Sequence, residues 1–194
     1  MVAHVAFVEN GQPFCMPFLH VRVDDTLYIH GSTGSRALRI LGGGAPACAM
    51  ITILDGLVLA RSVFEHSANY RSATLLGRFT PVPADKRSAV LEAFTDCLVP
   101  GRWKEVRGPS PKELAKTSVL AMPIDEASVK VRTGPPSDGD SPDATDDVWA
   151  GVLPVTTRLG TPEPAPELPH DLPLPQSVRT LCATATGDHH GDER

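Results

Sequence analysis

The segment YIHGSTGSR, residues 28–36, combines glycines, hydroxyl side chains and an arginine in a pattern that suits an anion. An apolar run ends near His30 and a second one, ALRIL, follows Arg36, which predicts a strand, a tight loop and a helix that begins near Ser35. A helix N-terminus presents unpaired N–H groups with a partial positive charge. Side-chain donors would add to that charge, namely Ser32, Thr33, Ser35, Arg36 and Arg39. The pattern indicates a phosphate site, and ordinary helix capping is the alternative.

A second polar segment, HSANYRS at residues 66–72, comes directly before the apolar run ATLLGRF. It contains an amide, a phenol, a guanidinium and hydroxyls on neighbouring positions, which are Ser67, Asn69, Tyr70, Arg71 and Ser72. Such a density of donors at the start of a strand suits a planar heteroaromatic ligand with a polar edge and a phosphorylated tail. A polar surface turn is the other interpretation.

Metal and hydrolase chemistry have no sequence pattern to support them. Successive cysteines are 33, 49 and 85 positions apart, which excludes a CxxC pair and zinc-type ligand spacing. The sequence has no HExxH, Walker A, GxGxxG or GxSxG motif. We therefore expect no metal site, and neither an obvious hydrolase nor a nucleoside triphosphatase.

The charge balance argues against two classes of partner. A formal net charge of −5 over 194 residues leaves too few basic side chains for a dedicated nucleic-acid-binding face. No stretch approaches the roughly 20 apolar residues that span a bilayer. We expect a soluble, cytoplasmic protein that binds neither nucleic acid nor membrane.

The elements that must position these segments are mostly short strands. Strand-like runs occupy residues 2–8, 14–23, 26–30, 47–54, 57–63 and 72–82, and later 118–124, 128–132 and 148–159. Turn pairs separate several of them, namely Asn10-Gly11, Asp24-Asp25 and Asp55-Gly56, and the last of these predicts a two-residue hairpin. Helices are expected at about 35–41 and 84–98, with a short one opening at Pro111. This order favours a mainly β barrel or sandwich with a few helices.

The C-terminal part has a different composition. Residues 134–147 read as a loop, and TPEPAPELPHDLPLP at 161–175 is too rich in proline for a helix or an interior strand. We divide the chain into a domain at 1–159 and a proline-rich tail at 160–194, expected to be extended or disordered. This tail is a candidate for wrapping a partner subunit.

The two polar segments, followed by VPGRW and ELAKTSVLAMPIDEASVKVRTGPP, resemble the pyridoxamine 5′-phosphate oxidase-related flavin-nucleotide-binding proteins. Within that family the sequence is most similar to the branch of the nitroimidazole-resistance proteins. The resemblance covers residues 2–159 and implies a split β-barrel that binds FMN in a groove between the two subunits of a homodimer.

Carried over by position, the resemblance places Ser35 and Arg36 on the FMN phosphate. It places His30, Gly31 and Ser32 at the strand end that passes the flavin, with His30 shaping an acceptor pocket. It implies further cofactor contacts from Pro17, Phe18, Ser67, Asn69, Tyr70, Arg71 and Ser72, and from Lys130 and Trp149, the last from the partner subunit.

Two positions depart from the family pattern. The lysine that follows the Ser-Arg pair in the oxidases is Ala37 here, which removes one charge from the phosphate, and Arg39 could compensate in part. The sequence also starts on a strand where the family usually has a helix first, so we expect either that one wall of the cleft is missing or that the start site lies upstream.

Three functions follow from the resemblance. The first is an oxidoreductase that passes electrons from NAD(P)H through FMN to a small acceptor such as a nitro compound, with no protein nucleophile required. F420 could replace FMN in this function, because both present a phosphate and a tricyclic ring. The second is a carrier that binds flavin, or haem as a less favoured cofactor, without catalysis. The third and least favoured is oxidation of pyridoxamine phosphate, because the tail shows no Arg/His cluster for a second phosphate.

Overall fold

The structure is a computed structural model that describes residues 2–169 and 172–187. Nine strands dominate it: β1 (Val2–Glu9), β2 (Gln12–Val23), β3 (Thr26–Ser32), β4 (Pro46–Leu59), β5 (Ser67–Arg78), β6 (Thr80–Pro81), β7 (Thr117–Pro123), β8 (Glu126–Arg132) and β9 (Gly151–Pro154). The α-helices are α1 (Arg36–Gly42), α2 (Arg87–Leu98), α3 (Pro111–Lys116) and α4 (Gln176–Gly187). Short 3-10 helices are η1 (Val63–Glu65), η2 (Ala84–Lys86), η3 (Arg102–Glu105) and η4 (Pro142–Thr145).

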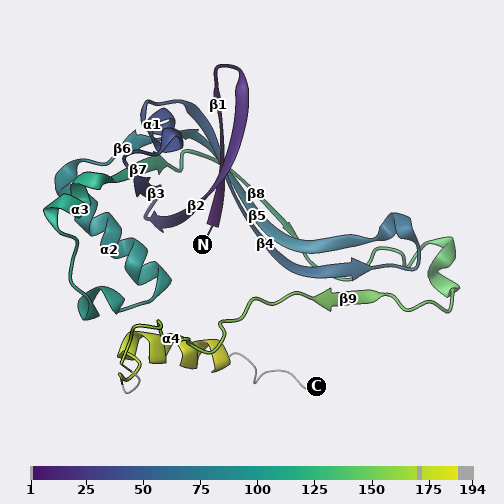
Figure 1. Cartoon of the computed structure of the whole chain (residues 1–194). Helices are drawn as coiled ribbons and strands as arrows, with labels where there is room; N and C mark the ends of the chain where they lie inside the picture. Colours follow the sequence, from purple (N-terminus) through teal and green to yellow (C-terminus); the bar gives the residue numbers. More distant parts are fainter. Residues whose placement is uncertain (1, 170–171, 188–194) are drawn as a thin grey trace.

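All strands belong to one antiparallel sheet that curls into a half-barrel. Its order is β6-β7-β3-β2-β1-β4-β5-β8, and β9 adds to β4 at its far end. Figure 1 shows the curled part with α1 beside it, and β4, β5 and β8 extending away from it as a long ribbon. The architecture is mainly β with a few helices, as expected.

One face of the sheet forms the core. Alternate residues of the strands are buried there together with the apolar side of α1. The cluster includes Ala3, Val5, Phe7, Leu27, Ile29, Leu38, Leu41, Ala49, Leu75, Phe79, Leu120 and Met122. Because α1 packs into this cluster, the core fixes the loop that precedes the helix.

The predicted turn at Asn10-Gly11 is confirmed, because both residues have positive φ angles, 50° and 78°, between β1 and β2. The predicted hairpin at Asp55-Gly56 is wrong. Residues 46–59 form one continuous strand, and the register with β5 shifts between Leu54 and Gly56 as in a β-bulge. A Cβ on Gly56 would lie 3.0 Å from Val152 Cγ1, so close approach of β9 explains the glycine.

The far end of the ribbon is tied together by an ion pair. We call this part of the molecule the arm: residues 55–69 of β4, η1 and β5, together with β9 and residues 133–150. Asp138, on the last of these segments, accepts hydrogen bonds from the backbone N–H and the guanidinium of Arg61, at 2.7 and 3.0 Å. Figure 1 shows η1 and η4 together at this end.

The tail differs in part from the expectation. Residues 160–169 and 172–175 form no regular element, but residues 176–187 form α4, although we expected an extended or disordered chain throughout 160–194. The first turn of α4 is held by η3, because Ser177 donates from its backbone N–H and its hydroxyl to Glu105 at 2.9 and 2.5 Å. Within the tail, proline occurs only before residue 176, so residues 176–187 can form a helix.

Among the described residues, none of the helices has the length and apolar character that crossing a membrane would need. No group of three or more His, Cys, Asp or Glu side chains within 2–169 and 172–187 is arranged to hold a metal ion.

Candidate functional site

The face of the sheet opposite the core is covered by α2 over β3 and uncovered over β1, β4 and β5, and we call this uncovered part the outer face. Strand register places residues of adjacent strands side by side on it: Cys15, Ala6, Cys48 and Leu76 in one row, and Pro17, His4, Met50 and Thr74 in the next. Several large apolar side chains on this face are exposed, among them Val2, Val8, Leu19, Met50, Leu54 and Leu76. A contiguous exposed apolar surface of this kind marks a binding or association face.

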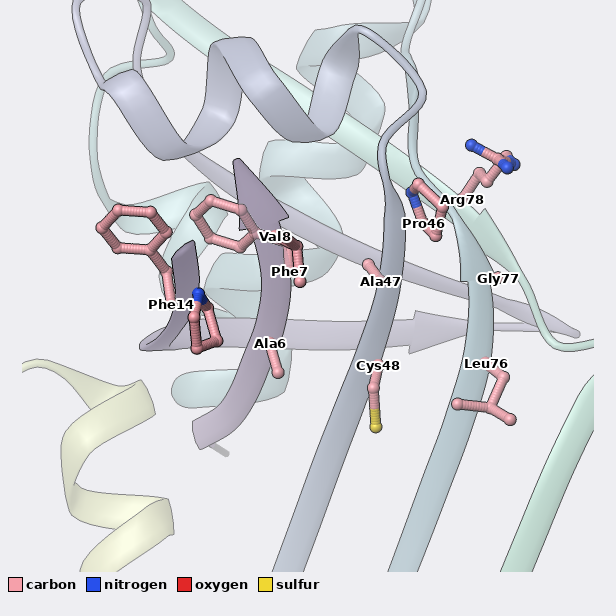
Figure 2. Close-up of a pocket in the computed structure, with 11 residues that line it drawn as sticks. Ala6, Phe7, Val8, Phe14, Pro46, Ala47, Cys48, Leu76, Gly77 and Arg78 are labelled. Atoms are coloured by element: carbon pink, nitrogen blue, oxygen red, sulfur yellow. The ribbon is translucent and has the colours of Figure 1, made fainter. Parts of the chain in front are cut away.

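An apolar groove of about 620 Å³ lies near the β1–β2 hairpin, and its lining combines residues of the outer face, such as Cys48 and Leu76, with Phe7 and Phe14 of the core face. Phe7 and Phe14 lie at one end with their ring centroids 5.5 Å apart and nearly parallel. Figure 2 shows these rings together, with Cys48 and Leu76 on neighbouring strands and Arg78 at the other end. The groove offers an apolar lining with the arginine side chain of Arg78 at one end.

A smaller hollow of about 240 Å³ adjoins it, shares Phe7 and Phe14, and includes the predicted pair Ser35 and Arg36. The Arg36 guanidinium lies 5.2 Å from the centroid of the Phe14 ring. It also donates to the carboxylate of Glu9. The Arg36 guanidinium therefore lies against an aromatic ring and is paired with the Glu9 carboxylate. An anionic group of a ligand could replace that carboxylate.

The loop before α1 has the geometry of a capped helix start. Ser35 accepts from the Leu38 N–H at 3.4 Å, and Ser32 accepts from the Gly34 N–H at 3.1 Å. Gly31 is required by packing, because a Cβ there would lie 2.9 Å from Leu38 Cδ1. The loop therefore shows the helix capping that was the alternative interpretation. Of the predicted phosphate donors, Ser35 and Arg36 line a hollow.

The predicted residues of β5 divide between the two faces of the sheet, as alternation requires. Tyr70 and Ser72 line a third hollow of about 500 Å³ on the outer face with Lys130 of β8, whose ammonium lies 5.8 Å from the Tyr70 ring centroid. Threonine and serine hydroxyls complete its lining, from Thr52, Thr74 and Ser128. This hollow is the more polar part of the outer face.

Asn69 and Arg71 project to the opposite face, where both have structural partners. Asn69 donates to the carbonyl of Gly134 at 3.1 Å and accepts from Arg132 at 2.5 Å. Arg71 makes a bidentate pair with Asp55 at 2.8 and 2.9 Å, and this hydrogen bonding holds the pKa of Asp55 below its usual range. Ser67 shares their face at the start of the strand, opposite Val58. The segment HSANYRS therefore does not form one contiguous surface within a subunit.

His30 lies on β3 beneath α2, where its ring meets Phe94 edge-on at 4.3 Å between centroids. Its Nδ1 atom is buried and has no hydrogen-bond partner, and burial lowers the pKa of the imidazole. Pro17 is exposed on the outer face of β2, whereas Phe18 packs partly against the core. His30 therefore lies on the opposite face of the sheet from the hollow that contains Arg36.

Trp149 lies just before β9, on the arm, and its side chain is 68% exposed. Its ring packs over Gly151, where a Cβ would lie 2.9 Å from the indole. Within one chain it is remote from the Arg36 hollow, at the other end of β4.

Sequence reasoning missed the aromatic floor of the site. Phe7 and Phe14 read as ordinary strand residues, and Arg78 as the end of an apolar run. The available signal was the Asn10-Gly11 turn, which fixes the hairpin register and so places Phe7 opposite Phe14.

Comparison with known proteins assigns the family. The family model described as pyridoxamine 5′-phosphate oxidase matches residues 1–131. The chain belongs to the pyridoxamine 5′-phosphate oxidase family, and its curled antiparallel sheet is the split barrel expected of it. A comparison with curated proteins finds no match.

Two solved structures resemble nearly the whole chain. The FAD and heme binding protein from Mycobacterium smegmatis is 48% identical, with a TM-score of 0.89, and the match covers 92% of this chain and 88% of that one. The flavocytochrome Anf3 from Azotobacter vinelandii is 39% identical, with a TM-score of 0.85, over 92% of this chain and 83% of the other. A 5-nitroimidazole antibiotic resistance protein from Bacteroides thetaiotaomicron shares the fold at 17% identity and a TM-score of 0.53, over 66% and 75% of the two chains.

Proposed function

We propose that this protein binds a flavin nucleotide in the groove beside Phe7 and Phe14 and works as a flavin-dependent redox protein. The observation that carries the proposal is the 48% identity, over nearly the full length, to a protein named for binding FAD and haem. The aromatic-walled hollow with Arg36 supports the same conclusion independently, because it pairs a flat apolar surface with a cation.

The residues present fit a flavin. Phe7 and Phe14 offer stacked rings beside a groove of about 620 Å³, a volume within the range of small-molecule sites. Arg36 would bind a phosphate oxygen in place of Glu9, and Ser35 lines the same hollow. Alanine at position 37 leaves fewer charges for a terminal monophosphate than the oxidases have. For this reason, and from the name of the relative from Mycobacterium smegmatis, we favour FAD over the FMN expected from the sequence.

A homodimer completes the site in this proposal. The outer face exposes apolar residues along β1, β2, β4 and β5, and a two-fold partner would cover them. Tyr70, Ser72 and Lys130 would then enclose the ligand from the partner's side, which gives the polar hollow a role. Asn69 and Arg71 would stabilise β5, the strand that presents Tyr70 and Ser72.

As an enzyme, the protein would take electrons from NAD(P)H and deliver them to a small acceptor. A bound flavin supplies the hydride chemistry itself. The chain binds and orients it, excludes water with Phe7 and Phe14, and keeps a cation at its anionic end. A nitro compound as acceptor and F420 as cofactor remain proposals from the family resemblance, since the nitroimidazole-resistance protein supports the fold alone.

The decisive experiment is the absorbance spectrum of the purified protein, with mass spectrometry of the released cofactor, which separates FAD, FMN and F420. Anaerobic mixing with NADH or NADPH then measures flavin reduction. A flavin that is bound but never reduced by either nicotinamide would leave the carrier function, and absence of any flavin after reconstitution would refute the proposal.

Haem is a second cofactor that a specific observation favours, because both relatives with 39–48% identity are named for haem or as a flavocytochrome. Two described histidines are exposed, His4 on the outer face beside Met50 and His66 on the arm. Either imidazole could ligate the iron. Absence of a Soret band after reconstitution with hemin would exclude this second function.

A further inference from the structure

The ribbon of β4, β5, β8 and β9, which ends in the arm, exposes apolar side chains on both faces. Ile53, Val129 and Val131 are exposed on the core side of the ribbon, and Leu54, Leu57 and Leu153 on the outer side. A ribbon of few strands with both apolar faces in water is of marginal stability. The ribbon that carries the arm therefore has the surface of an element that is covered on both sides.

The tip of the arm carries the most exposed apolar residues of the described chain. Phe64 is 91% exposed and Val63 is 87% exposed, both in η1. The turn that holds them is nevertheless well defined. The His66 Nδ1 accepts from the Ala60 N–H at 3.2 Å, and the Arg61–Asp138 ion pair ties the turn to the neighbouring loop. A rigidly held, solvent-exposed phenyl ring is typical of an interface anchor.

Charge is segregated between the two ends of the molecule. Residues 138–147 contain five aspartates, and four of them, Asp140, Asp143, Asp146 and Asp147, make no ion pair with any described residue. At the other end of β4, Arg39, Arg78 and Lys116 are exposed and likewise unpaired within the described chain. The 14 residues of β4 span roughly 45 Å, several Debye lengths, so these charges cannot neutralise each other within one chain.

We propose that the arm docks on a second copy of this chain, with its acidic tip over the basic end of the partner and Phe64 beside the partner's Arg36 hollow. The partner is a second copy of the chain because a two-fold axis pairs both complementary ends at once. The acidic tip of each subunit then meets the basic end of the other. The inference rests on the homodimer of the proposed function and adds its docking geometry. It also brings Trp149 of one subunit to the flavin site of the other.

The test measures dimer dissociation by analytical ultracentrifugation with apoprotein, so that flavin binding does not enter. Three variants are compared with wild type: Phe64→Ser, the double change Asp146→Lys with Asp147→Lys, and that double change combined with Arg39→Glu. Val106→Ser, an exposed apolar residue outside the arm, is the matched control. All changed side chains are exposed, so circular dichroism should show an unchanged fold.

We expect Phe64→Ser to raise the dimer dissociation constant on the order of tenfold or more, with Val106→Ser unchanged. The lysine pair should weaken the dimer, and Arg39→Glu should restore much of the loss by reversing the partner's charge. A monomeric wild type at micromolar concentration would overturn the inference, as would a dimer indifferent to the arm variants or a loss that Arg39→Glu fails to restore. Flavin content measured separately distinguishes these failures from failure of the proposed function.

Discussion

Asp138 and Arg61, 77 positions apart in the chain, form the ion pair that closes the tip of the arm. The carboxylate is 2% exposed and accepts from both the backbone and the guanidinium of Arg61. These hydrogen bonds, first the one from the backbone, hold the pKa of Asp138 below its usual range. The η1 turn and the loop that contains η4 are therefore one structural unit.

We predict that Asp138→Ala loosens both segments together. The Arg61 backbone N–H and guanidinium lose their shared acceptor, so amide hydrogen exchange should accelerate in residues 60–67 and in 138–147 alike. Asp140→Ala, which removes an exposed and unpaired carboxylate from the same loop, is the control. Faster exchange in one segment without the other would show that the pair does not couple them.

The Arg36–Glu9 pair predicts opposite effects of two substitutions on flavin affinity. Arg36→Ala should weaken binding by roughly ten- to a hundredfold, since a charge-assisted bond to phosphate is lost. Glu9→Gln should strengthen binding, because it removes the carboxylate that competes for the guanidinium. Titration by flavin fluorescence measures both. Equal dissociation constants for wild type and Arg36→Ala would remove Arg36 from the site.

Gly31 and Gly34 lie in the same loop but should respond differently to alanine. Gly31→Ala places a Cβ 2.9 Å from the buried Leu38, so we expect a loss of about 1–3 kcal/mol in the free energy of unfolding. Gly34→Ala meets only the Ser32 hydroxyl, at an ordinary 3.5 Å, and should change stability by less than about 0.5 kcal/mol. Urea denaturation of the two variants checks the difference, and similar losses would contradict the packing argument.

His30 predicts a pH dependence of stability. Burial lowers the folded-state pKa of this imidazole below the 6.5 of a solvent-exposed histidine, so the unfolded chain binds the proton more readily. The full contribution to stability is present above pH 6.5 and is lost as the pH falls from there through the folded-state pKa. Carboxylates with lowered pKa values, such as Asp55, contribute stability that is lost only at more acidic pH, as the pH falls below about 3.8. His30→Gln should flatten the stability profile between pH 7 and 5, and an unchanged slope would show that His30 is not the responsible group.

Local patterns predicted the elements of the barrel well. Alternation and turn pairs placed β1, β2, β3, β7 and β8, and the glycine run after residue 41 ended α1 where expected. These features depend on neighbours in sequence, which a single chain displays. The family followed from the order of such segments.

The site was harder to predict because its members meet only in three dimensions. HSANYRS reads as one cluster, yet strand alternation sends Tyr70 and Ser72 to one face and Asn69 and Arg71 to the other. The partner of Arg36 is Glu9, on a strand that sequence alone does not place beside α1. Helix α4 was missed because its proline-rich approach dominated the composition of the tail.

The bulge between Leu54 and Gly56 also limits how the arm can change in length. Before it, even-numbered residues of β4 point to the outer face. Beyond it, Leu57 shares that face while Val58 is buried on the other. A deletion of one residue between Gly56 and Leu59 would invert every side chain up to η1, so that Leu57, which is now exposed, becomes buried and Val58 becomes exposed. Insertions and deletions that preserve the arm should therefore occur in pairs, so its reach is adjustable only in steps of about 7 Å, two residues of extended chain.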